Sequence, residues 1–201
     1  MMTNKNINDD TKSNMTDLHN DITFCTKCGA KYDICSDSDG NPQRRVCNNC
    51  DSVHYDSPKI IVLSLVEYAG RILLCKRGIK PKHGYWTLPG GYMERNETIE
   101  GAAERETKEE TGVVAKNLQL YSLINCTGIN QVYFVFRGSV NDPSTIVGEE
   151  SLDVKFYTEC DIPWESLSYK LMKKILDWYF DDKADGKFKF RTYQTNEICP
   201  D

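Results

Sequence analysis

The sequence predicts an α/β domain preceded by a small cysteine-rich module. From Lys59 onward, short apolar segments of strand length alternate with segments in which acidic or apolar residues recur at helical spacing. Before Lys59, four cysteines occur in two closely spaced pairs, among glycines and polar residues that favour loops. A chain of 201 residues, 39% of them hydrophobic, suffices for one buried core with an appendage and is short for two full domains.

The N-terminal residues, the apolar runs and the net charge argue against several classes of protein. Residues 1–23 are rich in Asn, Asp, Thr and Lys without apolar periodicity, which predicts a disordered tail. They resemble neither a secretory signal nor a transit peptide, so we expect a cytoplasmic protein. The longest uncharged apolar run, 60–66, is too short for a membrane span. The net charge of −5 disfavours nucleic acid as a partner, and an anionic substrate would require a metal ion or a local basic patch.

The module at 24–57 contains the pattern C-x2-C-x18-C-x2-C, formed by Cys25, Cys28, Cys47 and Cys50. This spacing is typical of a tetrahedral zinc site. Two disulfides, four core cysteines or a redox pair are the alternatives, which the absence of an export signal and of a thioredoxin-like pattern disfavours. Four thiolates leave no open coordination position, so we expect a structural zinc ion. The remaining cysteines are unassigned packing or surface residues: Cys35, Cys75, Cys126, Cys160 and Cys199.

The larger domain, 58–182, begins with a predicted β-hairpin at 59–68 and 71–77, joined by a turn at Gly70. The segment WTLPGG then ends a strand in a rigid loop. Next comes the clearest helix, capped by Asn96 or Thr98 and ended by Gly112.

Three further strands are expected at 118–124, 131–138 and 153–157. The apolar stripe Leu167, Leu171, Ile175 and Trp178 predicts a C-terminal helix that packs on the core. Residues 183–201 are then expected to form a tail.

Three carboxylates share one face of the first helix. At 100° per residue, Glu106, Glu109 and Glu110 fall within about 100° of one another. Such like charges repel, and a divalent cation relieves the repulsion. Carboxylate oxygens suit Mg²⁺ or Mn²⁺, which share their ligand shell with substrate phosphates. The alternative is a solvated acidic face, which the flanking glycines and the ordered spacing disfavour.

These residues form the pattern G-x5-E-x7-R-E-U-x-E-E-x-G-U, where U is a bulky aliphatic residue. Its fixed positions are Gly91, Glu97, Arg105, Glu106, Glu109, Glu110, Gly112 and Val113. The pattern resembles the signature of the Nudix hydrolases, and the resemblance extends from about Lys59 to Phe180. Thr107 departs from the pattern at an aliphatic position, where we expect slightly poorer packing and no loss of chemistry. A four-cysteine ribbon before such a domain resembles two branches, the NADH pyrophosphatases and the plant plastid FAD/ADP-ribose pyrophosphohydrolases with their bacterial relatives.

The resemblance implies a Nudix α/β/α sandwich with a mixed sheet, which cleaves the pyrophosphate of a nucleoside diphosphate linked to another group. Mg²⁺ or Mn²⁺ would be held by Glu106, Glu109, Glu110 and a later acidic residue, for which Glu150 is the choice, with Glu149 and Asp153 as neighbours that could substitute. The catalytic set is then Glu106, Glu109, Arg105 and Glu150, while Gly91, Glu97 and Gly112 are structural. Arg105 is expected to fix Glu106 or Glu97. The family also implies a homodimer.

The substrate is harder to predict. The segment typical of NADH pyrophosphatases is absent, and the chain is most similar to the plastid group, which favours FAD or ADP-ribose with release of AMP. Arg77 is a candidate phosphate contact, and Tyr85 and Trp86 are candidates to stack on a base, although sheet core is the alternative for such aromatic residues. NADH or an RNA cap are alternative substrates, and a non-catalytic module that binds a ligand or nucleic acid is the alternative of a different class.

Overall fold

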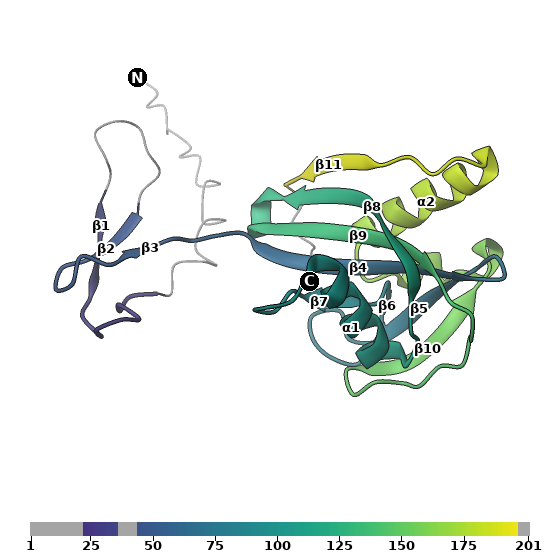
Figure 1. The fold of residues 1–201 in the computed structure, drawn as a ribbon, viewed down its shortest axis with the longest axis horizontal. Coiled ribbons are helices and arrows are strands. Elements are labelled where there is room, and N and C mark those ends of the chain that lie inside the picture. The colour runs from purple at the N-terminus through teal and green to yellow at the C-terminus, as the bar shows by residue number, and fades with distance from the viewer. Residues whose placement is uncertain (1–21, 36–43, 197–201) are drawn as a thin grey trace, which may run out of the picture. The chain divides into compact units, whose positions relative to one another are not determined.

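The computed structural model describes residues 22–35 and 44–196 and divides the chain into two compact units, 1–57 and 58–201. The predicted disordered tail lies outside the described residues except at its last two positions, and so does Cys199. The first unit contains an antiparallel sheet in the order β1-β2-β3 (Figure 1). Its strands are β1 (Tyr32–Cys35), β2 (Arg44–Cys47) and β3 (Val53–His54).

The second unit contains a mixed sheet in the order β10-β5-β4-β9-β8-β11. β4 pairs in parallel with β9, and β8 in parallel with β11, whereas the other pairs are antiparallel. The expected strands are present as β4 (Lys59–Tyr68), β5 (Arg71–Arg77), β6 (Trp86–Thr87), β8 (Lys116–Cys126), β9 (Gln131–Ser139) and β10 (Ser151–Tyr157). A short strand that was not expected, β7 (Gly90–Tyr92), lies in the segment predicted to be a loop. The expected α/β class and mixed sheet are therefore confirmed.

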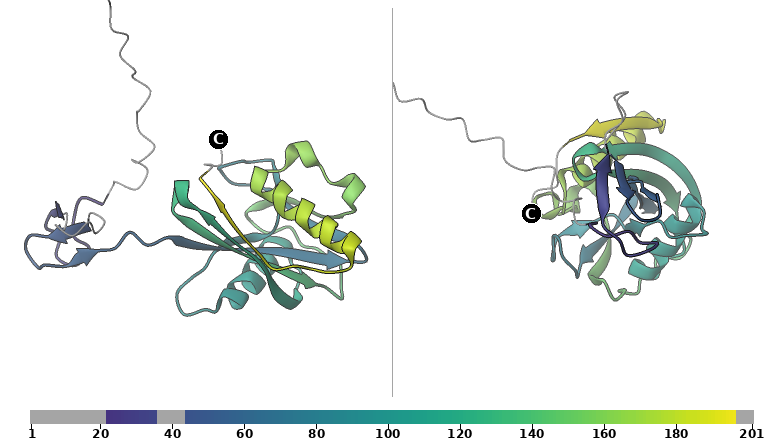
Figure 2. Two further views of the ribbon diagram at one scale, coloured as in Figure 1. Left: turned by 90° about the horizontal axis from the view of Figure 1, so that it is seen from above. Right: turned by 90° about the vertical axis from the view of Figure 1, so that its left-hand side faces the viewer.

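The two α-helices of the described residues, α1 (Ile99–Thr111) and α2 (Lys170–Asp185), cover opposite faces of this sheet (Figures 1 and 2). Because side chains alternate along a strand, Val62 and Phe136 pack with the alanines of α1, whereas Leu63 and Val135 pack with α2. β4 lies between both layers, and Ile61 to Val66 are all buried. This double coverage explains why β4 is an unbroken apolar run in the sequence.

The hairpin of β4 and β5 opens away from its turn. The two strands pair only at Glu67–Ile72 and Tyr68–Arg71. Farther along, β6 pairs with β5 and β7 pairs with β4, so the segment 86–92 fills the space between the separating strands. The Pro-Gly-Gly loop is thereby inserted into the sheet beside α1.

The C-terminal part differs from the prediction. α2 begins at Lys170, so Leu167 lies before the helix although it is buried in the same core cluster. The segment expected to be a tail contains β11 (Arg191–Thr195), which pairs with β8 at the edge of the sheet. Among the described residues, no helix has the length and apolar character needed to span a membrane.

Candidate active site and metal centres

The four cysteines predicted to bind zinc lie together in the first unit. Their Sγ atoms all lie within 4.8 Å of one another, with 3.4 Å between Cys28 and Cys47 and 3.7 Å between Cys25 and Cys50. A tetrahedron with Zn–S bonds of about 2.3 Å has S–S edges of about 3.8 Å, whereas a disulfide bond is about 2.05 Å long. All described cysteines are free thiols. The geometry fits a four-thiolate zinc site.

The two cysteine pairs are held by equivalent turns. The residue after each pair, Gly29 or Asp51, has a positive φ. Each donates its backbone N–H to the carbonyl of the first cysteine of its pair, at 2.8 Å to Cys25 and 3.0 Å to Cys47. The turns orient both thiols of each pair toward one point, as a tetrahedral site requires.

Helix α1 presents the acidic residues of the second unit. Thr98 accepts a hydrogen bond from the Gly101 N–H at its start, and Gly112 ends it in a left-handed conformation. Thr107 is fully buried and donates its hydroxyl hydrogen to the Ala103 carbonyl at 2.7 Å. The polar atom at this otherwise aliphatic position is therefore satisfied.

Arg105 links three glutamates through its guanidinium group. It donates to both carboxylate oxygens of Glu97, at 2.8 and 3.0 Å, to Glu106 at 2.7 Å and to Glu109 at 3.0 Å. The hydrogen bonds from Arg105 lower the pKa of Glu97 to about 2. Arg105 also donates to the Tyr92 carbonyl at 3.1 Å, so it joins α1 to the glycine loop.

Gly91 allows this loop to approach the helix closely. A Cβ atom at Gly91 would lie 2.6 Å from the carboxyl group of Glu106. Burial raises the pKa of Glu106, although the neighbouring Arg105 opposes the shift. The first glycine of the pattern thus makes room for a carboxylate.

Glu110 occupies the most enclosed position of the three helix glutamates. It accepts hydrogen bonds from the Gly90 N–H at 2.9 Å and from the Cys75 thiol at 3.4 Å. Burial raises the pKa of Glu110 to about 7, and burial also raises the pKa of Cys75. Cys75, to which the sequence assigns no role, therefore lies buried against Glu110 on the acidic face.

A cavity of about 770 Å³ opens over these groups. Arg77 and Arg105 line it together with six glutamates: Glu94, Glu106, Glu109, Glu110, Glu149 and Glu150. The structure thus brings Glu150 and its neighbour Glu149 to the helix glutamates, whereas Asp153 lies on β10 and pairs with Lys155 at 2.6 Å. Among the described residues, only the four cysteines gather three or more ligand atoms within 4.8 Å, and the carboxylates are spread along the cavity wall.

A second chamber of about 400 Å³ adjoins this cavity. Arg77, Ile79 and Tyr92 line both chambers, and Tyr133 and Gln131 line only the second. The Tyr133 hydroxyl donates to Gln131 at 2.7 Å, and the Gln131 amide donates to the Tyr92 hydroxyl at 3.3 Å. The second chamber therefore offers aromatic and polar side chains next to the acidic cavity.

The two residues expected to stack on a base, Tyr85 and Trp86, line neither chamber. Trp86 is 7% exposed, in edge contact with Tyr157 in the core beneath α2, and Tyr85 is 42% exposed outside both chambers. The burial of Trp86 agrees with the sheet-core alternative, and base stacking by either residue stays a prediction. Tyr92, Gln131 and Tyr169 line the second chamber, although nothing in the sequence pattern singled them out.

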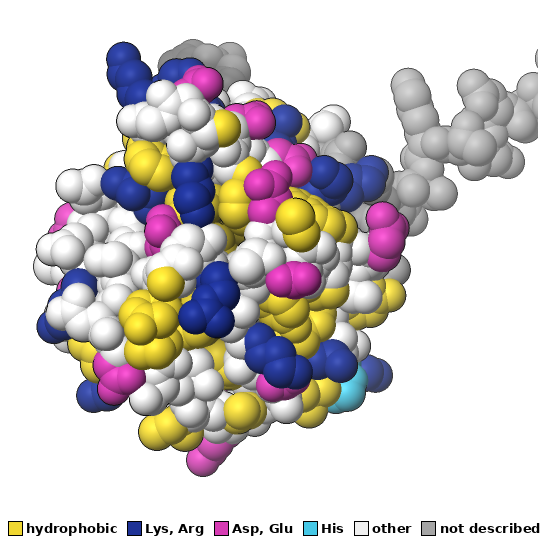
Figure 3. All heavy atoms as spheres, turned by 90° about the vertical axis from the view of Figure 1, so that its right-hand side faces the viewer, with side chains coloured by type: hydrophobic (Ala, Val, Ile, Leu, Met, Phe, Trp, Pro, Cys, Tyr) yellow, Lys and Arg dark blue, Asp and Glu magenta, His cyan; other side chains and the backbone are white. Residues whose placement is uncertain are grey.

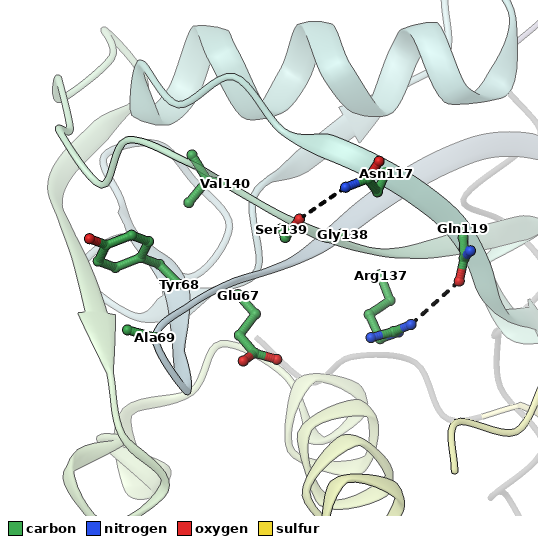
Figure 4. A pocket seen from close by; sticks show the side chains of 9 residues that line it. All are labelled: Glu67, Tyr68, Ala69, Asn117, Gln119, Arg137, Gly138, Ser139 and Val140. Carbon is green, nitrogen blue, oxygen red and sulfur yellow. Dashed lines mark hydrogen bonds between the residues drawn. The ribbon is translucent and has the colours of Figure 1, made fainter. Parts of the chain in front are cut away.

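A third hollow, of about 380 Å³, lies at the opposite end of β4 (Figure 4). Its polar side chains bond to one another, with Arg137 donating to Gln119 at 3.4 Å and Asn117 to Ser139 at 3.5 Å. On the face drawn in Figure 3, acidic and basic side chains are interspersed with hydrophobic ones. The first cavity differs from this face, because six glutamates and only two arginines line it.

The inserted glycine loop, the acidic helix and the cysteine ribbon are the features of Nudix hydrolases. Residues 57–179 match the family described as NUDIX domain, and residues 23–56 match the family described as Nudix N-terminal. The chain therefore belongs to the Nudix family of pyrophosphohydrolases, with the zinc ribbon that precedes the catalytic domain in some of its members.

Its relatives differ in their activities. The chain is 30% identical over 129 residues to the ADP-ribose pyrophosphatase of Methanocaldococcus jannaschii, a match that covers 62% of this chain and 76% of the relative. It is 30% identical over 102 residues to the NAD-capped RNA hydrolase NudC of Photobacterium profundum, covering 50% of this chain but 36% of that protein. A crystal structure of a NUDIX hydrolase from Nitrosomonas europaea, at 34% identity, covers 88% of this chain and all (100%) of that one with a TM-score of 0.84.

Proposed function

We propose that this protein hydrolyses the pyrophosphate bond of a nucleoside diphosphate linked to a second group, with the help of Mg²⁺ or Mn²⁺. ADP-ribose and FAD are the first candidate substrates, and both would release AMP. The observation that carries the proposal is the cavity of six glutamates and two arginines over α1 and the glycine loop. Such an excess of negative charge would repel a pyrophosphate unless cations neutralise it.

The residues of the cavity fit a divalent cation. Glu106, Glu109, Glu110 and Glu150 supply the hard oxygen ligands that Mg²⁺ and Mn²⁺ prefer. When bound, the cation would neutralise charge on the two phosphates and lower the pKa of a water ligand. Arg105 holds Glu106 and Glu109 at 2.7 and 3.0 Å and keeps their side chains oriented for this task.

Arg77 and the second chamber suggest how the substrate would lie. Arg105 is engaged with three glutamates, whereas Arg77 lines both chambers and bonds through Nε to the Pro81 carbonyl at 2.8 Å. We assign Arg77 to a substrate phosphate at the junction. The nucleoside would then occupy the second chamber, where Tyr92 and Tyr133 offer aromatic surface.

ADP-ribose is the first candidate substrate because the ADP-ribose pyrophosphatase relative matches this chain over most of its own length. FAD is retained because of the resemblance to the plastid group. Hydrolysis of an NAD-capped RNA end is the second candidate, supported by several NudC relatives that match over about half of this chain. NADH is a further candidate substrate for the same hydrolytic reaction. The alternative with a different kind of function is a non-catalytic module that binds a ligand or nucleic acid.

One substrate panel separates these proposals. Purified protein is incubated with ADP-ribose, FAD, NADH, diadenosine polyphosphates and NAD-capped RNA, with Mg²⁺ or Mn²⁺, and products are measured by chromatography. We expect AMP from ADP-ribose or FAD at the highest kcat/KM. Preference for capped RNA would favour the second candidate. Binding of a nucleotide or RNA without hydrolysis of any substrate would favour the non-catalytic module.

We also propose a homodimer, as the family resemblance implies. Light scattering of the purified chain at several concentrations tests this assignment. A mass near twice 23.0 kDa is expected, and a mass of one chain at all concentrations would contradict it.

A further inference from the structure

The loop that carries Glu149 and Glu150 is attached to the last turn of α1 through backbone atoms. The Ile146 N–H donates to the Thr111 carbonyl at 2.8 Å, and the Gly148 N–H donates to the Glu110 carbonyl at 3.0 Å. These carbonyls belong to the end of α1, where the helix itself offers no partners. The loop therefore completes the hydrogen bonding of the turn that bears Glu109 and Glu110.

Gly148 makes this attachment sterically possible. A Cβ atom at Gly148 would lie 2.1 Å from the Glu109 carbonyl oxygen and 2.9 Å from the Glu110 Cα. Real Cβ atoms do not approach backbone atoms so closely, and the obstacle is backbone rather than a flexible side chain. Any larger residue at 148 must separate the loop from the helix.

A second glycine holds the other side of the loop. The Gly78 N–H, directly after β5, donates to the Glu150 carbonyl at 2.7 Å. A Cβ atom at Gly78 would lie 2.9 Å from that carbonyl oxygen. The backbone of Glu150 is thus held between β5 and α1, while its side chain lines the cavity.

We propose that Gly148 and Gly78 are positioning residues for catalysis, which fix the carboxylate of Glu150 relative to those of Glu109 and Glu110. The proposal rests on the proposed function, in which these carboxylates hold the divalent cation. Residues 141–147 are mostly exposed and form no helix or strand, so the loop has little else to orient it. A site of this kind requires its ligands to be held within about 0.5 Å of the productive geometry.

The test compares Gly148→Ala and Gly78→Ala with a matched control, Gly138→Ala. A Cβ atom at Gly138 would also meet backbone closely, at 2.8 Å from the Lys116 carbonyl oxygen, but Gly138 lines the remote hollow (Figure 4). For each protein, Mn²⁺ affinity is measured by water proton relaxation, and kcat and KM are measured with ADP-ribose as substrate. Hydrogen exchange of the amides of residues 146–150 and Tm are measured as well.

We expect Gly148→Ala to weaken Mn²⁺ binding and lower kcat about 10- to 100-fold, with faster amide exchange at 146–150 and KM little changed. Gly78→Ala should act in the same direction and less strongly. Gly138→Ala should lower Tm and leave Mn²⁺ affinity and kcat unchanged. In a Glu150→Gln background, Gly148→Ala should add little further loss, because it acts through that carboxylate.

Several results would overturn the proposal. The first is a wild-type Mn²⁺ affinity in folded Gly148→Ala. The second is a loss of Mn²⁺ affinity and kcat in Gly138→Ala equal to that in Gly148→Ala. The third is a loss from Gly148→Ala that adds fully to the loss from Glu150→Gln. If Gly148→Ala does not fold, unchanged Mn²⁺ affinity in Gly78→Ala is the decisive contradiction. A wild-type protein that binds Mn²⁺ but cleaves no nucleotide would refute the proposed function alone, because Mn²⁺ affinity and amide exchange still test the positioning role.

Discussion

Arg105 is the residue on which the geometry of the cavity depends most. Its guanidinium contacts Glu97, Glu106 and Glu109 together with the Tyr92 carbonyl, so one planar group fixes two elements. A lysine retains the charge but cannot present donors in this fixed fork. The role of Arg105 is therefore geometric as well as electrostatic.

We predict that Arg105→Lys lowers kcat about 10- to 100-fold, a loss typical when the partner of a metal ligand is changed. Steady-state kinetics on the preferred substrate measures the effect, and Arg95→Lys, at a neighbouring exposed position outside the cavity, is the control. Unchanged kcat in Arg105→Lys would mean that charge alone suffices.

The sequence indicates some of these contacts and not others. The spacing of the pattern predicts that Arg105 reaches Glu97 or Glu106, because one helix and its adjoining loop determine both distances. The contact of Cys75 with Glu110 depends on how β5 is placed against α1, which no local pattern reveals. Tyr92 and Gln131 escape prediction for the same reason, since they meet only when β7 and β9 flank β4.

The C-terminal strand β11 is held by one buried carboxylate of α2. Asp182 is fully buried and accepts from both terminal nitrogens of Arg191 at 2.6 Å, from Tyr121 at 2.9 Å and from the Lys189 N–H at 3.0 Å. The hydrogen bonds from Arg191 hold the pKa of Asp182 well below its usual range. This network joins α2, β8 and β11.

We predict that Asp182→Asn lowers the free energy of unfolding by about 3 kcal/mol near pH 7, since it leaves a partly buried Arg191 without its charged partner. Because the pKa of Asp182 is lower in the folded than in the unfolded protein, its contribution is complete above about pH 4 and is lost as the pH falls further. Urea denaturation of wild type and variant at several pH values measures this. The difference should shrink below about pH 4, and a difference that stays constant would contradict the assignment.

β11 also shows where element prediction fails. Its sequence, RTYQT, is short and polar, and it follows a charged segment, so it resembles a tail. An edge strand buries little apolar surface, and its stability comes from pairing with β8 and from the Asp182 network. By contrast, α1 and β4 are predictable because caps and apolar runs lie within the elements themselves.

Across the molecule, the zinc ribbon and the Nudix domain are separate compact units. The ribbon contains the four thiols and the second unit contains the acidic cavity. A structural zinc site supplies folding energy to a module too small to form a large core.

We therefore predict that Cys47→Ser abolishes bound zinc, which should be about one ion per chain in wild type. Amides of the ribbon should lose protection from hydrogen exchange, while the unfolding transition of 58–201 stays near its wild-type temperature. Elemental analysis, hydrogen exchange and calorimetry measure these three quantities. Full zinc content in the variant would show that the cysteines are not the ligands.

We propose above all that the carboxylates over α1 form a cation-dependent hydrolytic centre. The most direct test is Mg²⁺-dependent release of AMP from ADP-ribose by wild type and by Glu109→Gln. The side chain of Glu109 is 60% exposed, so its loss should leave the fold intact. We predict turnover by wild type and a loss of more than about 100-fold in the variant at unchanged Tm. Equal release of AMP by the two proteins would contradict the claim.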